Sequence, residues 1–127
     1  MRFPDRETVE RLRREYPAGT IVELISMNDP QSPKPGTRGR VLLVDDVATV
    51  HIAWQTGSSL GAAYGEDVIR KVCPICGKPY TDPPALSRTD NKSLICPDCG
   101  VRQALESAGI SAEAQKEILR AIHENHN

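Results

Sequence analysis

Aromatic side chains are scarce in this 127-residue sequence, at 4% of the residues with one Trp and one Phe. A large aromatic core is therefore excluded, and the length fits one domain or two very small ones. Long apolar runs are also lacking, since none approaches the about 18 residues that span a bilayer, and we expect no contact with a membrane. Residues 1–7 run directly into charged side chains without the apolar segment of a secretion signal, so we expect a cytoplasmic protein.

A strong excess of charge is missing as well. The formal net charge is −1 at pH 7, and residues 1–72 carry ten basic and ten acidic side chains, while residues 73–127 carry six and seven. Neither part has the basic excess of a tight, phosphate-driven nucleic-acid binder. The chain is also not acidic enough to imitate DNA.

The residue patterns of an enzyme are absent too. No glycine-rich phosphate loop and no persuasive Ser/His/Asp or Cys/His arrangement occurs, so we expect neither catalysis nor a small-molecule substrate. Asp45 and Asp46 resemble a catalytic pair, but neighbouring strand residues point to opposite faces and Asp favours turns, which makes a turn the better interpretation. We interpret His51 as a half-exposed strand residue, and His123 and His126 as part of a polar terminus rather than a second metal site.

What the sequence does contain is two Cys-x-x-Cys pairs, Cys73/Cys76 and Cys96/Cys99, with 19 residues between the inner cysteines. This separation lies in the range of a four-thiolate zinc site. Four sulfurs at about 2.3 Å in a tetrahedron close the coordination shell, so we expect one structural Zn²⁺ with no open position for catalysis. Two disulfides or a redox dithiol are the alternatives, and a reduced cytoplasm favours thiols held on a metal.

Glycine follows each cysteine pair, as Gly77 and Gly100. We expect both to allow a turn with positive φ and to place N–H groups near the thiolates. Residues 73–127 have few large apolar side chains, so they bury too little surface to fold by burial alone. Structural zinc is typically worth roughly 10–16 kcal/mol, and we expect chelation to melt this part while residues 1–72 can stay folded.

The pattern along the chain predicts an α+β fold. We expect a helix over residues 5–16 with Asp5 as its N-cap, then strands over 20–27, 38–44, 47–54 and 59–64. Short strands with tight turns favour a small SH3-like antiparallel β-barrel over residues 1–72. We expect this barrel to close, because a chain with so few aromatic side chains cannot cover an open sheet edge. Residues 73–127 then form a four-cysteine zinc ribbon, with a loop over 78–92 and C-terminal helices over 101–108 and after Ser111.

Two places are candidates for contact with a partner. The first is the Trp54–Ser58 turn, in which Trp54 is either a recognition aromatic in a barrel groove or the centre of the barrel core, and the core is favoured. The loop between the cysteine pairs carries Arg88, Asp90 and Asn91 and is tied at both ends to the expected metal. It is either a contact surface or a hydrogen-bonded turn in which Arg88 binds Asp90 or Asp82, and both interpretations stay open.

Two stretches resemble known families. The motifs PGTRGRV (35–41), VDD (44–46), HIAW (51–54) and GS (57–58) resemble a family of short domains of unassigned function from phages, plasmids and conjugative elements of Gram-positive bacteria. The stretch 73–106, with its Ser-Arg-x-Asp-Asn core at 87–91, resembles small zinc-ribbon proteins of the same elements. One departure is Gln55, where the first family usually has an acidic residue.

These resemblances imply an origin rather than an activity. Small non-enzymatic proteins of mobile elements often occupy a surface of a host machine, and inhibitors of CRISPR nucleases are a prominent class. By this analogy we expect a zinc-containing phage or mobile-element protein that binds a host protein in the bacterial cytoplasm, as an anti-CRISPR-like inhibitor of a defence nuclease. The alternatives are a nucleic-acid-binding zinc-ribbon module for regulation or replication, with steep salt dependence, and a redox or metal-storage protein.

Overall fold

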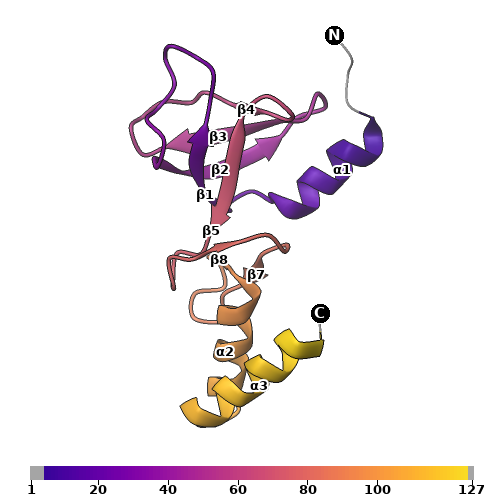
Figure 1. Cartoon of the computed structure of the whole chain (residues 1–127), viewed down its shortest axis with the longest axis vertical. Helices are drawn as coiled ribbons and strands as arrows, with labels where there is room; N and C mark the ends of the chain where they lie inside the picture. The colour runs from indigo at the N-terminus through magenta and orange to yellow at the C-terminus, as the bar shows by residue number, and fades with distance from the viewer. Residues whose placement is uncertain (1–4, 126–127) are drawn as a thin grey trace.

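The computed structural model describes residues 5–125, which form a sheet at one end and a pair of helices at the other (Figure 1). This part of the chain is α+β, with three helices and antiparallel strand pairs. In chain order the elements are α1 (Arg6–Glu15), β1 (Ile21–Ser26), β2 (Arg38–Val44), β3 (Thr49–Trp54), β4 (Ala62–Ala63), β5 (Val68–Val72), β6 (Pro79–Tyr80), β7 (Ala85–Leu86), β8 (Leu94–Ile95), α2 (Pro97–Ser107) and α3 (Ala112–Asn125).

Helix α1 confirms the predicted N-terminal helix. The carboxylate of Asp5 accepts the backbone N–H of Thr8 at 2.8 Å, as an N-cap does. Val9 and Leu12 share one stripe of the helix and are buried against the sheet. The spacing of these two residues therefore determines which face of α1 covers the core.

The main sheet has six strands in the order β4-β3-β2-β1-β5-β6, and every pair is antiparallel. The prediction of a closed barrel is wrong for residues 5–125, because the order starts at β4 and ends at β6 and no pairing joins these two edges. The argument from open edges fails because both edge strands are only two residues long. Short edge strands expose few unpaired backbone groups, so closure is not needed.

The strands from β4 onward differ from the sequence prediction. The strand expected over 59–64 is reduced to β4, while β5 was not predicted. The segment before β4 runs close to β3, since an added Cβ on Gly61 would lie 2.6 Å from Cγ2 of Thr49. Strand β6 lies in the segment expected to be loop, and its pairing with β5 carries the sheet across the expected boundary at residue 72.

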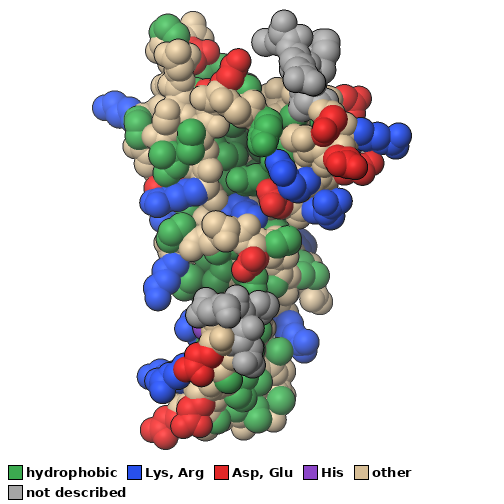
Figure 2. Space-filling model, turned by 45° about the vertical axis from the view of Figure 1, so that its right-hand side comes forward, with side chains coloured by type: hydrophobic (Ala, Val, Ile, Leu, Met, Phe, Trp, Pro, Cys, Tyr) green, Lys and Arg blue, Asp and Glu red, His purple; other side chains and the backbone are tan. Residues whose placement is uncertain are grey.

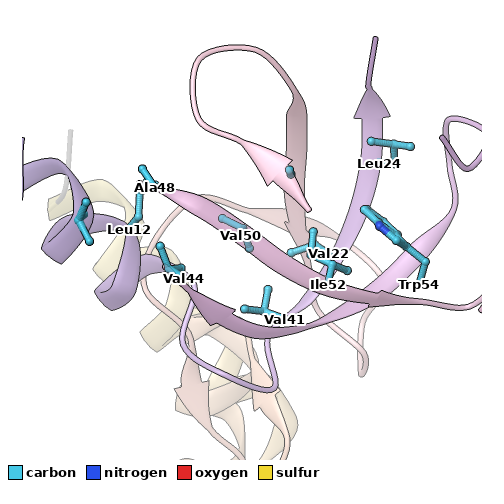
Figure 3. Packing of buried hydrophobic residues seen from close by; sticks show 11 residues of the cluster. Leu12, Val22, Leu24, Val41, Val44, Ala48, Val50, Ile52 and Trp54 are labelled. Carbon is cyan, nitrogen blue, oxygen red and sulfur yellow. The ribbon is translucent and has the colours of Figure 1, made fainter. Parts of the chain in front are cut away.

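The core of the sheet part lies between α1 and the inner faces of β1, β2 and β3 (Figure 3). An added Cβ on Gly39 would lie 2.6 Å from Ile52 and 2.9 Å from the Trp54 ring, so these side chains require glycine at that position. The cluster contains Val9, Leu12, Val22, Leu24, Val41, Val44, Ala48, Val50, Ile52, Trp54 and Ala62. The side chains of this cluster are aliphatic apart from the Trp54 ring, in agreement with the low aromatic content of the sequence.

The helical end is a hairpin of α2 and α3. Gly109, with φ of 78°, ends the turn after α2, and the hydroxyl of Ser111 accepts the N–H of Ala114 at 3.3 Å, as predicted for the cap of the last helix. Helix α2 starts at Pro97, before the predicted start, and so includes part of the second cysteine pair. Among residues 5–125, no helix is both long enough and apolar enough to cross a membrane.

Candidate metal centre

Two turns and a helix start bring the four cysteines together. Cys73 directly follows β5, and Cys76 lies in the turn that Gly77 ends with φ of 74°. Cys96 is the N-cap of α2, and Cys99 lies in the first turn of that helix. Regular elements therefore position both pairs.

The glycines after the two pairs act differently. Gly77 has the expected positive φ, and its N–H donates to the carbonyl oxygen of Cys73 at 2.8 Å. The expectation was wrong for Gly100, which is part of α2 and has no positive φ. An added Cβ there would lie 2.9 Å from Cβ of Ala85, so Gly100 is needed for the close approach of β7 to α2.

The sulfur positions fit a four-coordinate metal. All four Sγ atoms lie within 4.8 Å of one another, and those of Cys76 and Cys96 are 3.8 Å apart. Sulfurs about 2.3 Å from a central ion form a tetrahedron with edges of about 3.8 Å. All four cysteines are free thiols rather than disulfides. The four residues can therefore hold a metal ion.

Burial and backbone hydrogen bonds act in opposite directions on these thiols. Burial raises the pKa of Cys96 and of Cys99. Burial acts the same way on Cys73, but backbone hydrogen bonds, the strongest from Cys96, outweigh it and lower the pKa to about 7. The N–H of Cys99 also donates to Sγ of Cys96 at 3.4 Å. Buried sulfurs that carry negative charge together are stabilised by a cation, so this donor set suits a metal.

A buried lysine lies at the junction of the metal centre and the sheet. Lys71 of β5 is 3% exposed, and its Nζ donates to the carbonyl oxygens of Thr81 at 2.8 Å and Asp82 at 2.7 Å. The same Nζ lies 5.2 Å from the ring centroid of Tyr16 and 5.4 Å from that of Tyr80. An ammonium between two aromatic rings is favourable on both sides. Lys71 therefore connects the end of α1, the sheet and the segment after the first cysteine pair.

Tyr80 completes this junction from the metal side. Its ring packs against the cysteine cluster, and burial followed by the nearby Cys73 and Cys96 sulfurs raises its pKa. Neither Lys71 nor Tyr80 was predicted as a site residue from the sequence. Neither has a spacing or composition signal, because their contacts come from segments that are distant along the chain.

Within the loop between the pairs, Asp90 and Asn91 hold the turn. The Asp90 carboxylate accepts the hydroxyl of Ser93 at 2.5 Å and the N–H groups of Ser93 and Lys92, both at 2.9 Å. These hydrogen bonds, led by the Ser93 hydroxyl, lower the pKa of Asp90 to about 2. Asn91 has φ of 56°, a left-handed conformation that Asn adopts more readily than most residues. Both residues therefore stabilise the loop backbone.

Arg88 is different because only its backbone is tied down. Oε1 of Gln103 on α2 accepts the N–H of Arg88 at 2.7 Å, and the Gln103 amide also binds the hydroxyl of buried Ser87 at 3.1 Å. The Arg88 side chain is exposed and, within the described chain, binds neither Asp90 nor Asp82. Gln103, which anchors this loop to α2, was not predicted from the sequence.

Trp54 has no surface to offer a partner. Its side chain lies in the core of the sheet (Figure 3), the residue is 3% exposed, and its Nε1–H donates to the carbonyl oxygen of Leu60 at 2.8 Å. The contact role considered for Trp54 is therefore replaced by the core role that the sequence favoured. A single ring of this size fills the end of the aliphatic cluster.

Hydrogen bonds or ion pairs engage the described carboxylates and histidines that were considered for catalysis or for a second metal site. Asp45 accepts two backbone N–H groups of the β2–β3 turn and lies 2.8 Å from Nε2 of His51, which confirms the turn. Asp46 points elsewhere and pairs with α1. His123 lies 3.0 Å from Asp98, next to the second cysteine pair, and His126 lies outside the described residues.

The N-terminal part of the chain matches a known family. Residues 5–72, more than half of the chain, match the model of a family described as Domain of unknown function (DUF4314). No curated protein and no solved structure matches the chain. The match ends directly before Cys73, so the metal centre lies outside the part that the family describes.

Proposed function

The chain belongs to the DUF4314 family of domains of unknown function, and we propose that it is a non-enzymatic binding protein with one structural Zn²⁺. The observation that carries this proposal is the closed group of four sulfurs at Cys73, Cys76, Cys96 and Cys99. Thiolates in a tetrahedral arrangement suit zinc. Four protein ligands leave no position for water or substrate, so the ion would lock the two turns together and take no part in a reaction.

The proposed contact surface is the loop between the cysteine pairs, centred on Leu86 and Arg88. Leu86 is 53% exposed, and Arg88 has an exposed side chain with no partner in residues 5–125. The backbone beneath them is held by Ser87 and Gln103. A loop that is already ordered loses little conformational entropy on binding. An arginine beside an exposed apolar side chain is typical of a protein interface.

We propose that the partner is a protein of a bacterial host. The resemblance to proteins of mobile elements supports this choice, and an anti-CRISPR-like inhibitor of a defence nuclease is its most specific form. In this proposal the protein acts in the cytoplasm by covering a surface of its target. Asp90 and Asn91 contribute by holding the turn, and Trp54 contributes only to the core.

Affinity purification from a bacterial lysate, followed by calorimetry with the purified partner, tests the contact surface. We expect Arg88→Ala and Leu86→Ala each to weaken binding by about tenfold, as for anchor residues of an interface. Lys116→Ala is the matched control, since it removes an exposed charge from α3. A partner that binds all of these variants equally would contradict the proposal.

Elemental analysis of the purified chain tests the metal. We expect one zinc ion per chain, lost on treatment with a strong chelator. A purified chain without metal, or one whose sulfurs are bonded to each other, would remove the basis of the proposed function.

A further inference from the structure

The outer face of the six-stranded sheet carries several arginines. On β2, Gly39 and Val41 are buried. Arg38 and Arg40 alternate with these two residues along the strand, so their side chains point to the opposite, outer face. On β5, Arg70 reaches the same face, because its register partner Glu23 on β1 is also the partner of Arg38. These three strands are neighbours, and their basic side chains therefore form one surface.

A single carboxylate lies among these arginines. Glu23 binds Nη2 of Arg70 at 2.8 Å and lies 3.6 Å from Nε of Arg38. One negative charge facing two guanidinium groups leaves this trio with a net charge of +1. Glu23 therefore orients the two arginines and does not neutralise them.

Arg40 lies beside the trio at the edge of a groove of about 240 Å³ between the sheet and the metal centre. The other wall includes Pro74, from the first cysteine turn, and Lys92 with Leu94. Arg40 and Lys92 are exposed and have no side-chain hydrogen bond or ion pair in the described part of the chain, and no acidic residue lines the groove. In Figure 2, Lys and Arg side chains lie one below another along the left side of the molecule, from the end with the sheet to the end with the helices.

We propose that the surface formed by Arg38, Arg40, Arg70 and Lys92 binds the phosphate backbone of nucleic acid. Four cations and two carboxylates, Glu23 and the Asp90 that accepts the N–H of Lys92, give a local charge of +2, on a chain whose formal net charge is −1. Phosphate contacts of this kind depend on local charge rather than on the charge of the whole chain. This inference goes beyond the protein-binding function proposed above and does not depend on it.

The surface predicts a particular mode of binding. The one strongly exposed aromatic side chain of residues 5–125, Tyr64, lies beside α1 in a different hollow. The four cations of this surface are suited to phosphates, which carry no sequence information, so we expect binding that is independent of base sequence. Each phosphate contact contributes about −0.9 to the slope of log affinity against log salt, so we expect four contacts to give a slope of about −3.6, with Kd on the order of 10⁻⁴ M at physiological salt.

Fluorescence anisotropy of the metal-loaded full chain with a labelled duplex DNA of mixed sequence, over a series of salt concentrations, tests this inference. Arg40→Ala and Lys92→Ala should each weaken binding and reduce the slope by about 0.9. Arg40→Lys keeps the charge and should keep the slope. Lys116→Ala removes an exposed positive charge from α3 and should leave the slope unchanged. Thermal unfolding of each variant checks that the fold is intact.

Three results would overturn the inference. The first is no binding at the lowest salt, and the second is an equal loss of slope in Lys116→Ala and Arg40→Ala, which would show attraction without a defined surface. The third is binding of polyglutamate but not of DNA, which would assign the surface to an acidic protein segment. Failure of the Arg88 and Leu86 variants to affect a protein partner would leave the DNA measurements untouched, so the two proposals fail separately.

Discussion

The two parts of this molecule are stabilised by different means. Residues 5–72 bury a cluster of eleven apolar side chains, whereas the buried cluster after residue 72 has four members, of which three are cysteines and the fourth is Ile95. The first part has the material of an ordinary hydrophobic core. In the second part the sulfurs occupy the place of a core, so we expect a bound ion to supply most of the stability.

Loss of the metal should separate the two parts most strongly. We expect Cys99→Ser, or a strong chelator, to unfold α2 and α3, because metal binding is worth roughly 10–16 kcal/mol in small zinc peptides. The indole N–H of Trp54 is a built-in reporter of the sheet, since it is buried and bound to Leu60. In two-dimensional NMR spectra, the indole resonance should stay at its folded position. The amide resonances of α2 and α3 should at the same time move to the narrow range of unfolded chains. Movement of the indole resonance to its unfolded position would show that the two parts fold as one unit.

A matched pair of isoleucines sharpens the comparison. Ile52 and Ile95 are both 0% exposed, the first in the sheet core and the second beside the cysteines. We expect Ile52→Ala to lower the free energy of unfolding by about 2–5 kcal/mol, measured by Trp54 fluorescence in urea. Ile95→Ala should leave that transition near its original midpoint and weaken zinc affinity instead. Equal shifts of the Trp54 transition in both variants would contradict the separation.

Lys71 tests how the two parts are joined. Lys71→Met keeps the aliphatic stem but removes the ammonium, so the carbonyl oxygens of Thr81 and Asp82 lose their donor. We expect a loss of about 1–3 kcal/mol in urea denaturation. Lys78→Met, at an exposed position of the same segment, is the control. A Lys71→Met chain as stable as the original would mean that burial of the charge costs about as much as its contacts contribute.

The smallest effect concerns the β2–β3 turn. Burial raises the pKa of Asp45, but hydrogen bonds from His51, Thr49 and Val47 outweigh it, so the pKa is below its ordinary value. A lowered pKa in the folded state stabilises the fold above the ordinary pKa, and this contribution is lost as the pH falls through the folded-state value. His51→Ala should raise the Asp45 pKa, measured by carbon NMR of its carboxyl group. An unchanged titration midpoint of Asp45 in the His51→Ala variant would show that the backbone hydrogen bonds alone lower this pKa.

The features that could be predicted from the sequence are local ones. Cysteine spacing predicted the cluster of four sulfurs, because each pair needs only one short turn to bring its two cysteines together. The caps at Asp5 and Ser111 were found for the same reason, since a cap needs only residues within one helical turn.

The features that could not be predicted depend on contacts between distant segments. Strand β5 was not predicted because two of its residues, Arg70 and Lys71, are charged. Glu23 pairs with Arg70, and two aromatic rings lie beside the Lys71 ammonium, so contacts with distant segments stabilise this strand. The anchoring of the Arg88 backbone depends on Gln103, which lies beyond the second cysteine pair. The open sheet was missed because the length of the edge strands is set by how β4 and β6 pack, and no composition rule gives that length.

The shared edge between β5 and β6 has a consequence for how the family domain can exist by itself. The matched region ends at Val72, yet Lys71 and Val72 are paired there with Tyr80 and Pro79. In a polypeptide cut after Val72, the edge of β5 would have unpaired backbone groups that can pair with another chain. The Lys71 ammonium would also lose its acceptors, the carbonyl oxygens of Thr81 and Asp82. Any relative that lacks a cysteine-rich extension would need a different shield for its last strand.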